Sequence, residues 1–543
     1  MHGMHALKKR AFFIIAFLMF LTTTSPHHAW AASSTKETDV IIVYKNQKGK
    51  QKAIHASDKV QAQYKHVPAV AVTADEKTVS SLKKDPNIAY IAENTKVQLS
   101  SSATKKSTNT AQDNLFQQSY NLKKLNIKQA MKDGVTGKNV KVAVLDTGIY
   151  PHEDLKITGG KSFVSYTSSY SDDVGHGTHV AGIIGALNND YGTIGVASDV
   201  KLYAVKVLNK KGKGDLVDLL RGIDWSITNK MDIINISLGF EENIPILRAA
   251  VDEAYKKGLL IVAASGNEGN KTPVIYPAAY SSVIGVSATD AKDKLASFAN
   301  TGSSIDFTAP GDQIISTYVN NEYWYATGTS QATPHVTGML ALLKQLHPNK
   351  TNVQLRTLLR SYALDLGTKG KDKQFGYGLV RYVSQSTFTK TADTYVKKAE
   401  KSKKQVDVDQ AKKKISILVA SKSKTALNKR VIAVQKNIHI SSARAKVKTA
   451  ETKKTQATIK SAQTAINKLD TGTEKQKLQK RLDQVKKHVA YQKKVASAKQ
   501  KVKTAETKKT KKTKVTAQSA VNQLKASKTK TTLQKRLNRI KVR

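Results

Sequence analysis

The sequence predicts an α/β protein whose central region folds as a mostly parallel sheet covered by helices on both faces. Between residues 113 and 385, short apolar runs typical of buried strands, such as VKVAVLD, DIINISLG and GLLIVAAS, alternate with amphipathic stretches such as DLVDLLRGIDWSITN. Strands that alternate with helices usually form a parallel sheet, because each parallel pair needs a crossover connection. Residues 111–390 hold 30 Lys and Arg against 25 Asp and Glu, which is ordinary for a globular domain.

The first 31 residues have the features of a secretory signal peptide. A basic cluster at residues 8–10 precedes an apolar run at residues 11–21, which is too short to span a bilayer, and the letters AWA at residues 29–31 match a cleavage site. No second long apolar run follows, so we expect a secreted chain without a membrane span. The chain has no cysteine, which excludes disulfides, thiol nucleophiles and thiolate metal sites.

Residues 32–110 are predicted to form a small α+β domain with a cleavable linker. The runs DVIIVYKN, VPAVAVTAD and NIAYIAEN have the pattern of strands, and SDKVQAQYKH and EKTVSSLKKD have the pattern of helices between them. Residues 99–112, LSSSATKKSTNTAQ, have the polar composition of an exposed linker that proteases reach easily.

The last 153 residues, from 391 to 543, form a polycationic tail. They hold 44 Lys and Arg against 9 Asp and Glu, a net charge of +35, and contain one glycine and two aromatic residues. The word KVKTAETKKT occurs at residues 446–455 and again at 501–510, and apolar residues recur at spacings of three and four in three copies. These spacings place each apolar set on one side of a helix. We therefore predict an all-α tail of three helical hairpins that pack on one another.

Three motifs in the central region carry side chains suited to catalysis. VAVLDTG ends a buried strand at Asp146, where a carboxylate is costly unless it is hydrogen-bonded, although a loop-capping aspartate is the simpler interpretation. GHGTHVAG places His176 before an apolar helix, in which His179 is expected to be structural. GTSQATPHVTG places Ser330 at a helix N-terminus, where backbone N–H groups can stabilise an oxyanion, although an N-cap serine has the same pattern.

The three motifs, in the order Asp, His and Ser, resemble the subtilisin-like serine proteases, the subtilase or S8 family, across residues 115–382. The resemblance implies that Ser330 is the nucleophile, that His176 is the general base and acid, and that Asp146 orients His176 and stabilises its cation. AASGNEG, residues 263–269, matches the stretch that supplies the family's oxyanion donor, here Asn267. The resemblance assigns a three-layer peptidase domain to residues 111–385.

The family's substrate groove holds a peptide as an added strand. The resemblance places the walls of this groove at Gly212, Lys213, Gly214, Leu216, Ser237, Leu238, Gly239 and Glu268. Leu216 and Leu238 would line an apolar subsite, which implies broad endopeptidase specificity. Lys213 could favour acidic residues on the substrate, although a solvated loop lysine is the simpler interpretation.

The stretch ALNNDYGTIG, residues 186–195, resembles the family's calcium-binding loop. The resemblance implies that Ca²⁺ is held by the side chains of Asp154 and Asn189, by the carbonyl oxygens of Leu187, Tyr191 and Thr193, and by Gln117 as a further candidate. A surface loop without metal is the alternative. Gln331 stands where many relatives carry a methionine next to the nucleophile, which predicts tolerance of peroxide.

The resemblance also makes residues 36–98 an inhibitory prodomain of ferredoxin-like fold. This prodomain would block the groove with its C-terminal end and be removed by Ser330, with the cut between about residues 97 and 114. We expect a monomeric, secreted serine endopeptidase that is made as a self-processing zymogen and cleaves proteins and peptides. The polycationic tail is expected to bind a polyanion by releasing counterions. Two tyrosines are too few for specific nucleic-acid recognition, and outside the cell the available polyanions are the anionic cell-wall polymers, so we expect the tail to bind these. Two alternatives remain: a tail without a specific partner, and a polycationic wall-binding protein whose protease domain is degenerate.

Overall fold

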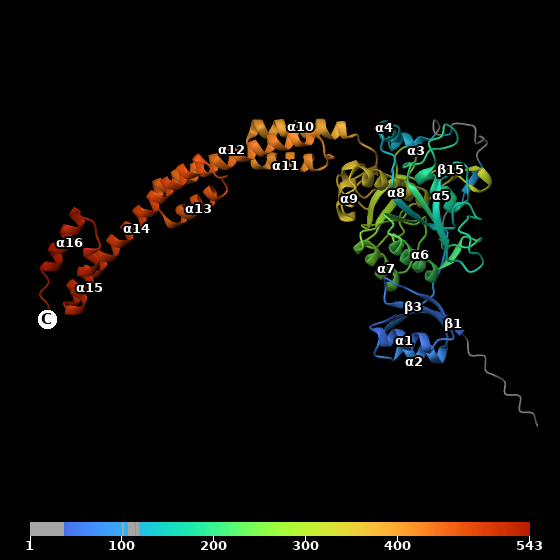
Figure 1. Cartoon of the computed structure of the whole chain (residues 1–543), viewed down its shortest axis with the longest axis horizontal. Coiled ribbons are helices and arrows are strands. Elements are labelled where there is room, and N and C mark those ends of the chain that lie inside the picture. Colours follow the sequence, from blue (N-terminus) through green and yellow to red (C-terminus); the bar gives the residue numbers. More distant parts are fainter. Residues whose placement is uncertain (1–36, 100–102, 107–114, 116–118) are drawn as a thin grey trace, which may run out of the picture. The chain divides into compact units, whose positions relative to one another are not determined.

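The computed structural model describes residues 37–99, 103–106, 115 and 119–543 (Figure 1). The predicted signal peptide and the candidate ligand Gln117 lie outside these residues. The chain divides into two compact units, of which the first ends at residue 93 and the second comprises residues 64–68 and 94–543. No helix in the described part of the chain combines the length and the apolar character needed to cross a lipid bilayer.

The first unit is a four-stranded antiparallel sheet with two helices, as the α+β prediction expects. Its elements are β1 (Glu37–Tyr44), α1 (Gln47–His55), β2 (Lys59–Gln63), β3 (Ala69–Asp75), α2 (Glu76–Lys83) and β4 (Ile88–Glu93), and the strand order is β2-β3-β1-β4. The helix predicted for SDKVQAQYKH is wrong, since this stretch contains β2. The helix lies earlier in the chain and begins at its N-cap Asn46. β2 is an edge strand that is largely exposed, so its polar residues conceal the strand pattern.

The second unit contains a nine-stranded sheet with the order β17-β18-β14-β13-β12-β11-β7-β9-β8. All neighbouring strands are parallel except β17, which pairs antiparallel with β18. The strands are β7 (Lys141–Asp146), β8 (Ile157–Ser162), β9 (Lys201–Lys206), β11 (Ile233–Ile236), β12 (Leu260–Ala264), β13 (Ile284–Thr289), β14 (Ile305–Pro310), β17 (Ala363–Leu364) and β18 (Leu379–Val380). The central strands are buried along almost their whole length, as strands covered on both faces must be.

Helices cover this sheet, which confirms the predicted fold class. They are α3 (Tyr120–Lys124), α4 (Ile127–Lys132), α5 (His176–Gly185), α6 (Leu216–Thr228), α7 (Pro245–Lys256), α8 (Thr329–Leu346) and α9 (Asn352–Leu359). α8 packs against β11 to β14 and against α5, whereas α6 and α7 pack against each other and against β7 and β12. β7 lies between β9 and β11, so its carboxyl end is a point where the strand order reverses, and α/β sheets commonly hold their sites there.

Two small sheets join segments that are distant in sequence. β5 (Lys96–Gln98) pairs antiparallel with β10 (Lys213–Asp215), and β6 (Ala103–Lys106) pairs antiparallel with β16 (Tyr323–Ala326), which also pairs with β15 (Ile314–Thr317). Within the predicted linker at residues 99–112, residues 103–106 thus form a strand that the sequence did not indicate, although Lys106 is exposed as expected of a linker. Polar residues gave no strand signal there, because an added strand is held by its backbone hydrogen bonds rather than by apolar side chains.

The tail is all-α, as predicted, but its units are three-helix modules rather than hairpins (orange and red in Figure 1). Its helices are α10 (Gln385–Ser402), α11 (Gln405–Ser416), α12 (Lys422–Lys453), α13 (Gln456–Asn467), α14 (Thr473–Lys508), α15 (Lys511–Asn522) and α16 (Lys528–Asn538). α12 and α14 each serve two modules: one half of the helix packs in one apolar cluster and the other half in the next. The first helix also begins at Gln385, before the change in composition at residue 391.

Each module contains the same helical joint. In the word KVKTAETKKT, Lys454 takes a left-handed conformation with φ of 52° and ends α12, and Thr455 caps α13. Lys403 and Lys509 take the same conformation after α10 and α14. In every module the joint's glutamate binds an arginine 30 residues later, in the pairs Glu400–Arg430, Glu451–Arg481 and Glu506–Arg536. The word is therefore a structural joint that all three modules share, although its letters recur in only two.

Candidate active site

Asp146 is the last residue of β7 and is fully buried. Its Oδ1 accepts hydrogen bonds from the N–H of Thr147 at 2.7 Å and from Nδ1 of His176 at 2.8 Å. A buried carboxylate needs such donors, and these two hold it in one orientation. The structure therefore brings together two of the three residues that the sequence motifs single out.

His176 is the first residue of α5, and the glycines beside it allow the helix to approach β7 closely. A Cβ atom at Gly177 would lie 2.1 Å from the carbonyl oxygen of Gly148 and 3.1 Å from Cβ of Asp146. A Cβ atom at Gly175 would lie 2.2 Å from the ring of Tyr318. Both glycines thus serve the packing that sets His176 against Asp146.

The environment of His176 favours its protonated form. Burial alone would lower the pKa of His176, but the charge of Asp146, the hydrogen bond to Asp146 and the charge of Asp172 raise the pKa above its ordinary value. Asp172 also fixes the start of α5, because its Oδ2 accepts hydrogen bonds from the N–H and the hydroxyl of Thr178. Sequence reasoning missed Asp172, and its position just before the histidine motif was the only signal.

Ser330 is the second residue of α8 and is buried at the N-terminal end of that helix. Its Oγ donates to the carbonyl oxygen of Ser237 at 3.0 Å, and Oγ of Ser237 donates to the carbonyl oxygen of Ser330 at 3.0 Å. α8 packs against α5, the helix that begins with His176. A hydroxyl group at this point lies at the positive end of the helix dipole, which favours a developing negative charge.

Asn267 lies in the loop after β12, and its side chain is fixed to the start of α8. Its Oδ1 accepts hydrogen bonds from the N–H and from Oγ1 of Thr329, both at 2.8 Å. Because the amide oxygen is used in this way, the NH₂ group remains the donor of this side chain. The loop therefore presents a side-chain donor one residue away from Ser330.

The predicted substrate groove is occupied by residues 95–99 of the same chain. β5 lies antiparallel to β10, with Lys96 opposite Asp215, Val97 opposite Gly214 and Gln98 opposite Lys213. Two further hydrogen bonds extend this pairing, from Leu99 N–H to Gly212 O at 3.0 Å and from Leu216 N–H to Thr95 O at 2.9 Å. A peptide therefore does lie along β10 as an added strand.

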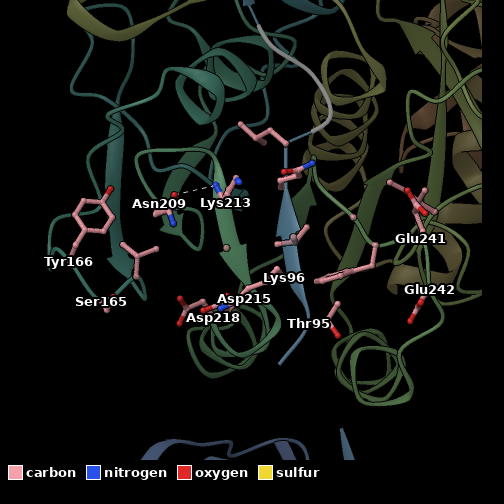
Figure 2. Close-up of a pocket in the computed structure, with 18 of the residues that line it drawn as sticks. Thr95, Lys96, Ser165, Tyr166, Asn209, Lys213, Asp215, Asp218, Glu241 and Glu242 are labelled. Atoms are coloured by element: carbon pink, nitrogen blue, oxygen red, sulfur yellow. Dashed lines mark hydrogen bonds and ion pairs between the residues drawn. The ribbon is translucent and has the colours of Figure 1, made fainter. Parts of the chain in front are cut away.

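A cavity of about 750 Å³ surrounds this strand (Figure 2). Carboxylates line much of it, from Asp215, Asp218, Glu241, Glu242 and Glu268. Figure 2 shows Glu241 and Glu242 on one side of Lys96 and Tyr166 on the other. Lys96 forms an ion pair with Asp215 at 2.6 Å. Carboxylates outnumber lysines among the residues that line the cavity, so this lining gives no support to the expectation that Lys213 favours acidic substrates.

The other predicted groove residues differ in their positions. Gly214, Lys213, Gly239 and Glu268 line the cavity. Leu216 and Leu238 are almost fully buried while β5 lies along β10, and they are not among the residues that line the remaining cavity, so the apolar subsite expected for them stays a prediction. Leu216 instead offers its backbone N–H to the strand, because its side chain belongs to the buried face of α6. Val97 of β5, which lies opposite Gly214, is a buried apolar side chain of the added strand.

The candidate calcium ligands come together in the loop that follows α5. Oδ2 of Asp154 accepts from Thr193 N–H and from Tyr323 OH, both at 3.1 Å, and Asp154 O accepts from Leu187 N–H. Oδ1 of Asp154 and Oδ1 of Asn189 are buried without a hydrogen-bond partner among the described residues. Burial raises the pKa of Asp154 to about 7. Two buried oxygens without donors fit a hard cation that prefers oxygen ligands. No cluster of three or more His, Cys, Asp or Glu side chains suited to a metal occurs in the described ranges.

Sequence comparison defines the class of protein to which this fold and site belong. Residues 137–378 match the model described as the subtilase family, and residues 19–100 match the model described as peptidase inhibitor I9. The chain belongs to the subtilase family, and it is a serine endopeptidase made as a zymogen.

Individual relatives extend the match beyond the peptidase region. The chain is 52% identical over 532 residues to "Minor extracellular protease Epr" of Bacillus subtilis, which covers 97% of this chain and 81% of the relative. It is 42% identical over 355 residues to Subtilisin E of Bacillus subtilis, which covers 64% of this chain and 86% of the relative. It is 40% identical over 352 residues to "Thermostable alkaline protease" of Halalkalibacterium halodurans, covering 64% and 92%.

Proposed function

We propose that Ser330, His176 and Asp146 hydrolyse peptide bonds through an acyl-enzyme. Nε2 of His176 takes the proton of Ser330 Oγ as this oxygen attacks the substrate carbonyl, and then gives the proton to the departing amine. A water molecule, deprotonated by the same imidazole, then releases the acyl group. The 2.8 Å hydrogen bond between His176 and Asp146 carries this assignment, because it fixes the tautomer and stabilises the imidazolium that both steps require.

The tetrahedral oxyanion is stabilised by the side-chain amide of Asn267 and by the backbone N–H of Ser330. The hydrogen bonds of Asn267 Oδ1 to Thr329 support this role, because they hold the amide beside the nucleophile before the substrate binds. The position of Ser330 at the start of α8 supports the role of its N–H. Loss of one such donor typically lowers kcat by about 10²–10³-fold.

The prodomain inhibits the enzyme by placing β5 in the substrate groove, and the enzyme removes it by its own catalysis. The cut lies between Leu99 and Leu115. The N–H of Leu99 still donates to Gly212 O beside β10, whereas the N–H of Leu115 already donates to Gly192 O in the peptidase region. The strand pairing of β5 with β10 supports this order of events, because a strand placed as a substrate is both inhibitor and substrate.

Ca²⁺ is held by Oδ1 of Asp154 and Oδ1 of Asn189, with carbonyl oxygens of Leu187, Tyr191 and Thr193. The two buried oxygens without donors support this site. The ion would neutralise the charge of Asp154 and would link Asp154 to the loop of residues 186–195. Its role would be to stabilise the fold, not to take part in catalysis.

The signal peptide directs the chain out of the cell, and the tail retains the enzyme on anionic wall polymers. The net charge of +35 in residues 391–543 supports this role, because a polycation gains affinity for a polyanion by releasing counterions. Residues 391–543 also offer few aromatic side chains for stacking nucleic-acid bases, since Tyr395 and Tyr491 are the only Phe, Tyr or Trp residues among them.

The second candidate function is wall binding by the tail with a degenerate protease domain. A phosphonylating serine reagent separates the two functions. We expect it to block casein hydrolysis and to label Ser330, as read by tandem mass spectrometry, and to leave His176→Ala unlabelled. Wall retention of the intact chain should fall as salt rises, and a chain without residues 385–543 should hydrolyse casein without being retained. An unlabelled, inactive but wall-bound protein would support the second candidate.

A further inference from the structure

We propose that Lys206 is a positioning residue for catalysis, because its buried ammonium group holds together the two segments that carry Asp146 and His176. This inference rests on the catalytic roles proposed for Asp146 and His176 and adds a residue that those roles do not include. Lys206 is the last residue of β9, and in the parallel pairing of β9 with β7 it lies opposite Asp146. Its side chain is fully buried.

The buried ammonium group of Lys206 is costly unless it is paired and hydrogen-bonded. An apolar side chain of similar length, such as methionine, would fill the same space without that cost. Nζ of Lys206 donates hydrogen bonds to Thr147 O and, at 2.9 Å, to Asp173 Oδ1. It also lies 5.6 Å from the centre of the Tyr166 ring. These acceptors account for a lysine at this position, and their places in the chain indicate what it does.

The first acceptor belongs to Thr147, the residue that follows Asp146. The N–H of Thr147 donates to Asp146 Oδ1 at 2.7 Å, and its Oγ1 accepts from the N–H of Gly177 at 2.9 Å. Gly177 follows His176 in the first turn of α5. Thr147 therefore bridges the carboxylate and the helix that carries the imidazole. Lys206 fixes the remaining polar group of Thr147, its carbonyl oxygen.

The second acceptor belongs to Asp173, which precedes His176 by three residues. Its other carboxylate oxygen, Oδ2, accepts from the hydroxyl of Tyr166. The side chain of Asp173 is 39% exposed and that of Lys206 is 0% exposed, so water reaches the carboxylate but not the ammonium group. We therefore expect the bond to Thr147 O, more than the ion pair with Asp173, to carry the effect on catalysis.

Loss of the ammonium group would leave the buried carbonyl oxygen of Thr147 without this donor. The backbone after Asp146 could then turn, and the carboxylate would no longer be held in one orientation toward Nδ1 of His176. A misplacement of about 1 Å can lower the rate of an enzyme about 10²-fold. An interpretation in which Lys206 only forms a stabilising ion pair predicts instead that removing Asp173 as well repairs the damage.

The test compares self-processed enzymes with substitutions at Lys206 and its partners. The variants are Lys206→Met, Asp173→Asn, the combination of these two, Thr147→Val and Thr147→Ser. Lys201→Met is the matched control, because Lys201 is exposed at the other end of β9. The substrate is an internally quenched peptide with the sequence of residues 94–115, and titration with a phosphonylating reagent gives the concentration of active sites. Proton NMR measures the Nδ1 proton of His176, whose resonance reports its hydrogen bond to a carboxylate.

We expect Lys206→Met to lower kcat by about 10- to 100-fold and to change KM by less than about threefold, because the groove edge at β10 is left intact. The Nδ1 proton resonance of His176 should move upfield or broaden, since its bond to Asp146 is no longer held in one geometry. Removing Asp173 as well should not restore kcat. Asp173→Asn alone and Lys201→Met should each keep kcat within about threefold of the wild type.

The Thr147 variants test the same connection from its other side. Thr147→Val removes the acceptor of Gly177 N–H and should lower kcat, whereas Thr147→Ser keeps the hydroxyl and should keep kcat. Lys206→Met combined with Thr147→Val should be little slower than the slower of the two single variants, because both changes release the same residue. If Lys206→Met is not processed, the comparison of the two Thr147 variants decides the question.

A Lys206→Met enzyme with the kcat of the wild type, or with a lower kcat and an unchanged Nδ1 resonance, would overturn the inference. Recovery of kcat in the combination with Asp173→Asn, or equal kcat values for the two Thr147 variants, would also overturn it. A wild type that neither cleaves the peptide nor reacts with the phosphonylating reagent would instead contradict the proposed catalytic function.

Discussion

Ser237 and Ser330 exchange hydrogen bonds, since the hydroxyl of each donates to the carbonyl oxygen of the other at 3.0 Å. Nδ2 of Asn235 donates to Ser237 Oγ at 3.1 Å, and Oγ1 of Thr337 donates to Asn235 Oδ1 at 2.8 Å. This buried chain of bonds ties β11 to α8 on either side of the nucleophile. The hydroxyl of Ser330 has one proton, so it must leave Ser237 when it delivers that proton to His176.

Removing the hydroxyl of Ser237 should destabilise the enzyme by about 1–3 kcal/mol, because Ser237→Ala leaves the buried carbonyl of Ser330 and the amide of Asn235 without a partner. Denaturant unfolding of the phosphonylated enzyme, which cannot digest itself, measures this change. Ser282→Ala is the matched control, because Ser282 Oγ is buried without a hydrogen-bond partner among the described residues. Equal stabilities of the two variants would contradict the structural role of Ser237.

The pH dependence of catalysis should reflect the raised pKa of His176. The imidazole must be neutral to act as a base, so kcat/KM should fall with decreasing pH through a pKa above the ordinary value of about 6.5. In Asp146→Asn the charge that raises the pKa is lost while burial still lowers it, so the acid limb should move to lower pH. The same change should lower kcat by about 10⁴-fold, as in other proteases with such a triad. An acid limb that stays in place would show that Asp146 does not set the pKa of His176.

Removing calcium should lower the thermal stability of the enzyme. At a concentration of 100 Kd, a ligand that binds only the folded state stabilises it by about 2.7 kcal/mol, and a chelator should abolish this gain. Asp154→Asn should be as heat-sensitive in calcium as the wild type in chelator. Asp190→Asn, a change of the same charge at an exposed position in the same loop, should keep the calcium effect. Equal inactivation rates with and without calcium in the wild type would contradict the site.

Gln331 should make the active site resistant to peroxide. It is fully buried next to Ser330, and its Oε1 and Nε2 have no hydrogen-bond partner among the described residues. Gln331→Met should therefore be at least as stable as the wild type, since it removes unpaired buried polar atoms, but its thioether should be oxidised. The half-life of activity in dilute peroxide distinguishes the two proteins. Rapid inactivation of the wild type in dilute peroxide would contradict this prediction.

The central sheet and the positions of Asp146 and His176 can be predicted from the sequence because each depends on a local apolar pattern. β7 is an apolar run that ends at Asp146, and α5 follows a glycine-flanked histidine, so each residue carries its own signal. Lys206 carries no such signal. It lies in a strand pattern that suggests an exposed lysine, yet its Nζ is buried against Thr147 O and Asp173 Oδ1. Partners that are adjacent only in the folded chain cannot be found by spacing.

The groove and the tail show two other limits of sequence patterns. β6 is polar apart from Ala103, and it forms a strand because it pairs with the edge of β16, more than 200 residues away. Leu216 was expected to line the groove through its side chain, and the contact that the structure shows is made by its backbone N–H, which donates to Thr95 O, while the side chain is buried. In the tail, apolar spacing identifies the helices but not that α12 and α14 each belong to two modules.

The mass of the secreted Ser330→Ala protein tests the central claim most directly. Without the nucleophile, β5 should remain in the groove, and the protein should keep its prodomain as an unprocessed precursor in a host that lacks other extracellular proteases. Ser282→Ala, which removes a buried hydroxyl elsewhere, should be processed as the wild type is. A Ser330→Ala protein with the same mature N-terminus as the wild type would contradict the claim that this chain cleaves itself through Ser330.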